Sequence, residues 1–255
     1  MRIIIINIIM AFLSLIFIGF AGWTYGQSIY HEKVRKYFYE KPVSEIENLK
    51  TLSALTDRIV LLTGNVIASE TFTSRKNKKV ILERYLEETK KINSKKDWHT
   101  EKKSSFFKVL PFKLKGDKTE VLIDTFGLDK TYIGIPEINI ITEDKRLRKK
   151  SLWIIEPSQN VYILGNVESK ANQLVINNPN LYKSFFIPFW KKEPFIITTM
   201  SKLEVPNKAI EIGQNLYYVS LALFTVGGFF LISSLSNIIK TYNSLKNSLG
   251  FEHDE

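Results

Sequence analysis

Cysteine is absent from this sequence of 255 residues. Zinc sites built on thiolates, disulfides, thiol nucleophiles and C-x-x-C redox centres are therefore excluded. Histidine is also scarce. The three histidines are far apart in the sequence, and no two of His31, His99 and His253 have the spacing of metal ligands. Neither a G-x-S-x-G nucleophile elbow nor a phosphate-binding P-loop is present. We therefore predict no catalytic residue, no metal and no cofactor.

Charged residues are missing from two long stretches, one near each end of the sequence. The first runs from Ile3 to Thr24, which as a helix covers about 33 Å, enough for a bilayer core of about 30 Å. The second, from Leu216 to Leu235, begins with a pair of tyrosines of the kind found at membrane interfaces. We expect membrane-spanning helices at residues 3–25 and 216–235 of a two-pass integral membrane protein.

Each apolar stretch allows a second interpretation. The first could be a cleaved signal peptide with Arg2 as its basic start, but it exceeds the usual apolar length of about 7–15 residues, so we favour a retained anchor. In the second, Gly227 and Gly228 suit close helix–helix contact. A structural scaffold, in which this helix sets an oligomer, is therefore one hypothesis for the function.

The loop between the two stretches, residues 26–215, holds the whole excess of positive charge. The chain has 36 basic and 26 acidic residues, a net charge of +10, and the few charges outside the loop cancel. The charges that flank the stretches weakly favour a cytoplasmic loop, but long domains cross membranes largely regardless of charge. The side of the membrane on which the loop lies therefore stays open.

Local patterns divide this loop into a helical beginning and a β-rich remainder. We expect a juxtamembrane helical stalk over residues 26–56, broken at Pro42 and restarted at Ser44 with Glu47 as a capping pair. A β-rich domain follows over residues 57–203, then a connector over 204–215. After the second stretch, residues 236–255 form a polar tail.

Short runs of alternating or β-branched residues predict about seven strands in the β-rich part. Such strands, separated by turns, favour a small barrel or sandwich and an α+β protein overall. The charged segment Thr142–Lys150 is predicted to be a loop or a short helix. The strands are expected at residues 58–67, 78–88, 98–107, 108–114, 118–125, 160–167, 173–177 and 195–199, with a hairpin turn around 168–170.

Several short motifs follow one another in a recognisable order along this part. They are Leu61–Val66 (LLTGNV), Asp97-Trp98-His99, Leu110–Leu114 (LPFKL), Glu120–Asp124 (EVLID), Val161–Val167 (VYILGNV) and Pro194–Ile197 (PFII). The series resembles the GIDE domain, also called the BAM ("beside a membrane") domain. That domain lies between two membrane spans in mitochondrial and plastid E3 ubiquitin ligases and in bacterial membrane proteins. The resemblance implies a membrane-proximal module and favours a non-cytoplasmic loop.

The ligase activity of that family does not follow from the resemblance. In the ligases a zinc-binding RING comes after the second span, and a RING needs roughly eight Cys or His ligands. Here the corresponding tail contains only His253. We expect a non-catalytic binding or scaffold module. The alternatives are a RING-less relative of E3 ubiquitin ligases and a hydrolase with an unrecognised site.

Two groups of residues are singled out for structure and for binding. A structural signature is predicted at Gly64, Trp98, Pro111, Phe112, Gly165 and Phe195, where the glycines allow bulges or close backbone approach. Asp117, Asp124 and Asp129 are interpreted as turn residues rather than acid–base groups. Contacts with lipid headgroups are predicted for Lys145, Arg146, Arg148, Lys149, Lys150, Trp190, Lys191 and Lys192.

Further basic clusters occur at 75–79, 90–91, 95–96 and 102–103. Such charge could bind nucleic acid. For a domain tethered to a bilayer, however, anionic headgroups are the nearest partners, at about 1 kcal/mol per basic residue. We therefore predict membrane lipid as a partner, together with a protein partner or a homo-oligomer, and consider nucleic acid less favoured.

Overall fold

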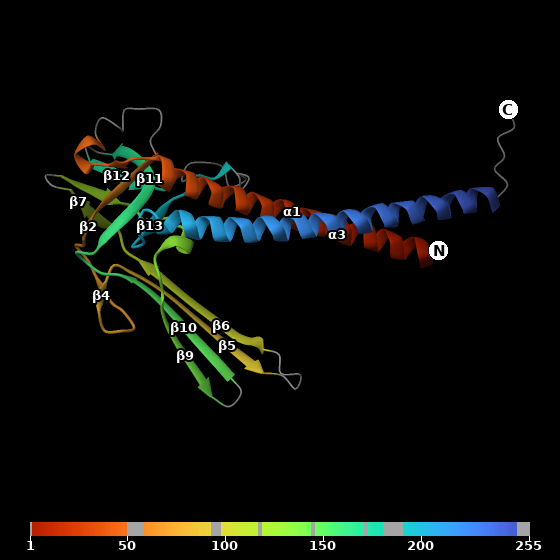
Figure 1. Cartoon of the computed structure of the whole chain (residues 1–255), viewed down its shortest axis with the longest axis horizontal. Helices are drawn as coiled ribbons and strands as arrows, with labels where there is room; N and C mark the ends of the chain where they lie inside the picture. The colour runs from red at the N-terminus through yellow and green to blue at the C-terminus, as the bar shows by residue number, and fades with distance from the viewer. Residues whose placement is uncertain are drawn as a thin grey trace. The chain divides into compact units, whose positions relative to one another are not determined.

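The computed structural model describes residues 2–49, 59–92, 98–116, 119–143, 146–170, 173–180 and 191–248. The chain divides into two compact units (Figure 1). The helical unit holds residues 1–32, 186–192 and 208–255, and the β unit holds residues 33–185 and 193–207. Two long apolar helices thus flank a mainly β domain, which confirms the predicted fold class in outline.

The two long helices are α1 (Arg2–Glu40) and α3 (Glu204–Ser248). Both are long and apolar enough to cross a membrane. Helix α1 runs without a break through the predicted span and into the predicted stalk, and it ends just before Pro42 because proline disfavours helix in the residue that precedes it. Helix α3 covers the predicted connector, the predicted span and the tail as far as Ser248.

Within the helical unit, α1 and α3 pack antiparallel along a seam of small residues. The Ser28 hydroxyl donates to the Gly213 carbonyl at 2.9 Å, and the Ser220 hydroxyl donates to the Ala21 carbonyl at 2.9 Å. A Cβ added to Gly227 would lie 3.2 Å from the Ser14 carbonyl oxygen. Along each helix these contacts recur every seven positions, the repeat of a coiled-coil seam. Small side chains let the two backbones approach closely.

The β unit is built on a closed barrel of five strands. They are β2 (Ile59–Ile67), β7 (Phe112–Lys115), β8 (Glu120–Ile123), β11 (Asn160–Lys170) and β12 (Gln173–Asn177). The order around the barrel is β2-β7-β8-β12-β11, and β11 pairs with β2 to close the ring. Among the pairs formed by these five strands, only β8 with β12 is parallel. This five-stranded Greek-key arrangement is that of the OB-fold, an architecture that does not by itself define a function.

Two short strands extend the barrel sheet. They are β1 (Val43–Ser44), parallel to β2, and β13 (Ile196–Thr198), antiparallel to β11. At β1 the prediction that a new helix starts at Ser44 is wrong, because Ser44 pairs as part of a strand. A 3-10 helix η1 (Ile46–Asn48) follows instead, and its N-cap is Glu45 without a side-chain capping bond. Strand pairing with Leu61 and Leu62 outweighs the local capping signal here. Residues 50–56 of the predicted helical stalk lie outside the described residues.

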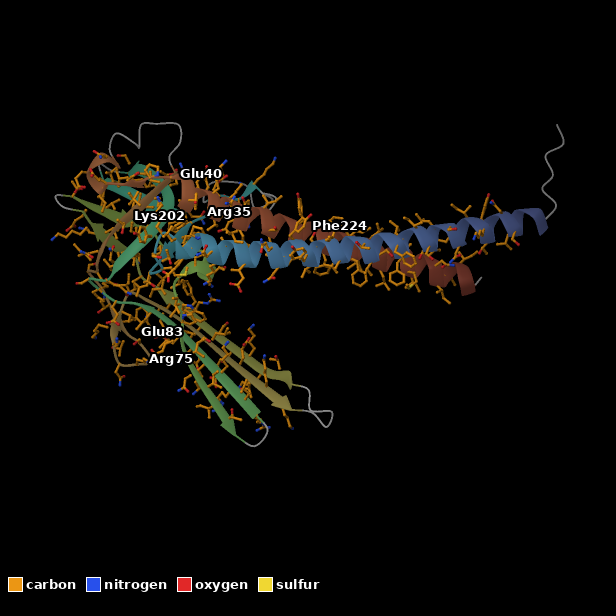
Figure 2. All side chains as sticks on the ribbon, viewed as in Figure 1. Arg35, Glu40, Arg75, Glu83, Lys202 and Phe224 are labelled. Carbon is orange, nitrogen blue, oxygen red and sulfur yellow. The ribbon has the colours of Figure 1, made fainter. Side chains whose placement is uncertain are left out.

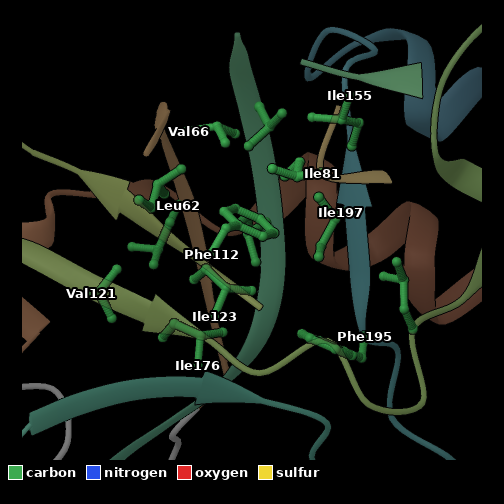
Figure 3. Close-up of a cluster of buried hydrophobic side chains, with 14 of the residues drawn as sticks. Leu62, Val66, Ile81, Phe112, Val121, Ile123, Ile155, Ile176, Phe195 and Ile197 are labelled. Atoms are coloured by element: carbon green, nitrogen blue, oxygen red, sulfur yellow. The ribbon is translucent and has the colours of Figure 1, made fainter. Parts of the chain in front are cut away.

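Alternating side chains of the barrel strands fill its interior (Figure 3). In β7 and β8, Phe112, Leu114, Val121 and Ile123 point inward and are buried, while the residues between them are less buried. This period of two is the pattern from which the strand at residues 118–125 was predicted. Of the two predicted alternatives, a barrel or a sandwich, the structure has the barrel.

A second sheet contains the strands β5 (Leu82–Ile92), β6 (Trp98–Val109), β9 (Glu137–Glu143) and β10 (Arg146–Ile155). Its order is β6-β5-β10-β9 and every pair is antiparallel. The β5–β6 hairpin is inserted between barrel strands β2 and β7, and the β9–β10 hairpin between β8 and β11 (Figure 1). A small hairpin of β3 (Phe72–Thr73) and β4 (Lys79–Val80) precedes β5.

The second sheet corrects two predictions. Thr142–Lys150 is neither loop nor helix in its described residues, because β9 runs to Glu143 and β10 starts at Arg146. The strand predicted at residues 78–88 is divided at Ile81, which bonds to the backbone of Ile155 and Leu110 and carries the chain from β4 into β5. The predicted hairpin of β11 and β12 is present, but residues 168–170, predicted to be its turn, belong to β11 and pair with β12 as far as Lys170 and Gln173.

Candidate functional site

The second sheet carries two chemically different faces. Residues directly opposite each other on paired strands point to the same face, and neighbours along a strand point to opposite faces. Arg148 lies opposite Thr89, which in turn lies opposite Lys102. By the same register Arg146 lies opposite Lys91. Together with Lys150 these residues share one face, which we call the basic face: Lys91, Lys102, Arg146, Arg148 and Lys150.

Acidic side chains balance only part of this charge. Glu87 lies 3.5 Å from Arg148 and also accepts a hydrogen bond from the Tyr85 hydroxyl at 2.7 Å. Burial raises the pKa of Tyr85, and the bond to Glu87 adds to that increase. The neutral phenol therefore stays a donor to Glu87 at neutral pH. Arg146, Arg148, Lys91 and Lys102 are all exposed, so the basic face presents cations to solvent.

Arg75 and Glu83 lie close together at the end of this face nearest the barrel (Figure 2). Two aromatic rings also contact the Arg75 guanidinium. The guanidinium carbon lies 4.4 Å from the Tyr85 ring centre and 5.0 Å from that of Phe106. Glu83, whose side chain is 3% exposed, receives the Arg75 side chain at 3.0 Å and the Arg75 backbone N–H at 3.0 Å. This contact attaches the β3–β4 hairpin to the second sheet.

A shallow hollow lies beside Arg75 on the same face. Its volume is about 530 Å³. Its lining includes Tyr85, Lys150 and Leu152, together with Lys76, which is paired with Glu137. The hollow therefore adds a polar concavity to the basic face, large enough for a small anionic group.

The opposite face, which we call the isoleucine face, is defined by Ile138, Ile140, Leu86 and Leu147. Ile138 is 49% exposed and Ile140 57% exposed. Lys103 and Glu88 form an ion pair of 3.2 Å on this face. The two faces differ because Arg146, Arg148 and Lys150 point to one side of β10, whereas Leu147, Lys149 and Ser151 point to the other.

The base of the isoleucine face is closed by the segment around the 3-10 helix η2 (Lys130–Tyr132). Arg84 stacks on Trp153 at 4.5 Å, and the Trp153 indole donates to the Gly134 carbonyl at 3.1 Å. Burial lowers the pKa of Arg84, and the Asp129 carboxylate opposes this shift. These contacts position the second sheet on the barrel of the same unit.

The residues of the predicted structural signature lie in both sheets of the β unit, most of them in or beside the barrel. Phe112 and Phe195 are buried in the core, and Pro111 directly precedes β7. A Cβ on Gly64 would lie 2.7 Å from the Lys115 carbonyl oxygen, and a Cβ on Gly165 2.7 Å from the Ile176 side chain. Both glycines therefore permit close approach of their neighbours. Trp98 begins β6.

The predicted headgroup residues are divided between the two units. Arg146, Arg148 and Lys150 share the basic face, while Lys149 points to the isoleucine face. Lys191 and Lys192 belong to the helical unit. Lys145 and Trp190, like Asp117, lie outside the described residues.

Sequence reasoning did not join two further groups to this site. Lys91 and Lys102 stood in separate basic clusters, and only the strand register places them beside Arg146 and Arg148. The Arg75–Glu83 contact was not predicted. Its one signal in the sequence is that Glu83 directly follows the apolar run Val80–Leu82. Asp124 and Asp129 accept backbone N–H bonds from residues two positions later, as turn residues do.

Among the described residues, no group of three or more His, Asp or Glu side chains is arranged to hold a metal ion. No family model, curated protein or solved structure matches this chain. The described residues of the second sheet thus present cations on one face, with a shallow polar hollow beside Arg75.

Proposed function

We propose that the chain is a two-pass membrane protein whose β unit is a GIDE/BAM-like, non-catalytic module that binds anionic lipid headgroups. The observation that carries the proposal is the basic face, on which the register places Arg146 opposite Lys91, and Arg148 across Thr89 from Lys102. The cations come from three neighbouring strands, so they act on one surface rather than as scattered charges.

The proposed membrane spans supply the reason for choosing lipid. Helices α1 and α3 enter and leave the β unit, and both are long and apolar enough to cross a bilayer. A domain connected at both ends to such helices stays close to headgroups. Each Lys or Arg near an anionic surface contributes about 1 kcal/mol, and the effect decays within a Debye length. The five cations of the basic face outnumber the two acidic residues that the register places opposite Lys150 and Arg146, which are Glu87 and Glu143, so the face keeps a positive charge that favours anionic lipid.

The test uses the full chain in lipid nanodiscs and exploits the absence of cysteine. Ser104, exposed on β6 and on the basic face, is replaced in the variant Ser104→Cys and labelled with a fluorescent donor. Acceptor dyes are placed on the lipid headgroups. We expect energy transfer to increase when part of the phosphatidylcholine is replaced by phosphatidylserine, and to fall again at ~1 M salt, where the Debye length is about 3 Å.

A charge-matched pair of variants makes the test specific. Arg146→Gln, Arg148→Gln and Lys150→Gln together remove three cations from the basic face, which should weaken binding about a hundredfold. Lys79→Gln, Lys113→Gln and Lys115→Gln remove the same charge from other exposed positions of the β unit and should leave the signal unchanged. The proposal is contradicted if energy transfer is the same with and without phosphatidylserine, or if it falls equally in both triple variants.

A further inference from the structure

The two edges of the second sheet are protected unequally. In the described part of the chain, β6 and β9 are the outer strands. Strand β6 carries Lys102, Lys103 and Lys108, and lysines on an edge discourage pairing with another strand. Strand β9 has the sequence EINIITE, with acidic residues only at its ends. Its middle therefore offers unpaired backbone N–H and C=O groups without a protecting charge.

Exposed apolar side chains accompany this open edge. Ile138 and Ile140 are both on the isoleucine face, about half exposed. In β10 their direct neighbours are Ser151 and Lys149, which do not cover them. An exposed edge strand with large apolar side chains is a template for pairing with another strand.

We propose that β9 pairs antiparallel with β9 of a second copy of this chain, about a two-fold axis at Asn139. In this register Ile138 lies opposite Ile140 of the second copy, and Ile140 opposite its Ile138. Four isoleucines then form one apolar group on the isoleucine face. On the other face Glu137 lies opposite Ile141. Pairing ends at Pro136, which has no N–H to donate.

The distribution of charge in β9 favours a second copy of the chain as its partner and favours the register about Asn139. The neighbouring two-fold register, about Ile140, would place Glu137 opposite Glu143, and like charges directly opposite are unfavourable. The Asn139 register avoids that contact and brings isoleucine to isoleucine. Two-fold contacts are self-complementary and are the commonest symmetry of protein assemblies. The inference does not depend on lipid binding by the basic face.

The absence of cysteine permits a direct test by disulfide cross-linking of the full chain in lipid vesicles. Residues directly opposite on antiparallel strands have Cα atoms about 4.5–5.5 Å apart, within the range for a disulfide. The variant Asn139→Cys should form a covalent dimer under mild oxidation at least ten times faster than Ser104→Cys, an exposed position on β6. Equal rates for the two variants would overturn the proposal.

The register is tested by mixing two differently tagged chains, one with Ile138→Cys and one with Ile140→Cys. We expect cross-links between the two kinds of chain to exceed those within either kind. Dominant cross-links among Ile140→Cys chains alone would overturn the Asn139 axis. Adding Ile140→Lys to Asn139→Cys should remove the dimer, because a charge at the edge blocks pairing. A variant that still unfolds cooperatively but keeps its cross-linking rate would count against the interface.

Discussion

The carboxylate of Glu83 is buried beneath Arg75, which binds it through both its guanidinium and its backbone N–H at 3.0 Å. Glu83 belongs to β5, and Arg75 belongs to the turn between β3 and β4. Because the carboxylate is almost inaccessible while the guanidinium is about half exposed, the two partners are not equivalent. Losing the partner of the buried Glu83 carboxylate should therefore cost more stability than losing the partner of the half-exposed Arg75 guanidinium.

Replacing Arg75 by alanine should therefore destabilise the β unit. The change leaves the Glu83 carboxylate with the backbone N–H alone and removes the cation from the rings of Tyr85 and Phe106. We expect a loss of about 2 kcal/mol in the free energy of unfolding, measured by urea denaturation of the full chain in detergent. Lys113→Ala, which breaks the exposed pair with Glu120, is the control and should cost less than ~1 kcal/mol. Equal effects would show that Glu83 is not structurally dependent on Arg75.

The glycines of the barrel give a second prediction. Gly165→Ala places a methyl group 2.7 Å from Ile176 and 3.0 Å from Phe195, which are side chains that can shift. Gly64→Ala places it 2.7 Å from the Lys115 carbonyl, a backbone atom that cannot move without its strand. Overpacking of this kind costs about 1–3 kcal/mol, and Gly64→Ala should be the more severe of the two. Thermal unfolding monitored by circular dichroism measures the order, and the reverse order would contradict the role given to the Lys115 backbone.

The strands of the barrel could be predicted because each buries one face, although their pattern fits a barrel or a sandwich equally. Phe112, Leu114, Val121 and Ile123 alternate with less buried residues, so their sequence records the inward direction. The glycines could be recognised for a related reason, since each interrupts an apolar strand. The long apolar runs at the chain ends likewise predicted both helices.

The β9–β10 hairpin of the second sheet could not be predicted in the same way. Both of its faces are partly exposed beyond the base, so Arg146–Lys150 shows no apolar alternation and reads as a charged loop. Its strand character comes from pairing with β5, more than fifty positions earlier in the chain. The basic face exists only through that long-range register, which no local pattern contains. Arg75–Glu83 is hidden for the same reason: burial of one carboxylate depends on how the small hairpin packs.

Tyr132 gives a prediction for alkaline pH. Its side chain is fully buried, and burial, followed by the nearby Asp129 carboxylate, raises the pKa of the phenol above its ordinary value near 10. The unfolded chain therefore loses the phenol proton first as pH rises. Stability that is complete below pH ~10 is lost above it, by up to about 1.4 kcal/mol per pH unit.

The variant Tyr132→Phe removes this titration while keeping the ring. We expect the difference in unfolding free energy between the parent chain and the variant to be constant from neutral pH to about pH 9. Above pH ~10 the parent should lose stability faster than the variant. Urea denaturation at a series of pH values measures this, and parallel curves up to pH 11 would show that the phenol ionises equally in both states.

The two adjacent glycines of α3 provide a matched pair for the helix seam. A Cβ on Gly227 would lie 3.1 Å from the Ile18 side chain and 3.2 Å from both Phe17 and the Ser14 backbone, whereas a Cβ on Gly228 would meet nothing within 4 Å. Gly227→Leu should therefore separate α1 from α3, and Gly228→Leu should leave them packed. The helix propensity gained is the same in both variants, so it cancels in the comparison.

The spacing of the helices is measured by a disulfide within one chain that carries Ala21→Cys and Ser220→Cys, the positions joined by the hydroxyl–carbonyl bond of 2.9 Å. We expect oxidation of this pair to slow at least tenfold when Gly227→Leu is added, and to stay unchanged with Gly228→Leu. If Gly228→Leu instead leaves this disulfide intact but abolishes the Asn139→Cys dimer, the outer face of α3 also contributes to assembly. If both leucine variants oxidise at the parental rate, the seam through Gly227 does not hold the helices together, and close packing in the helical unit must come from other residues.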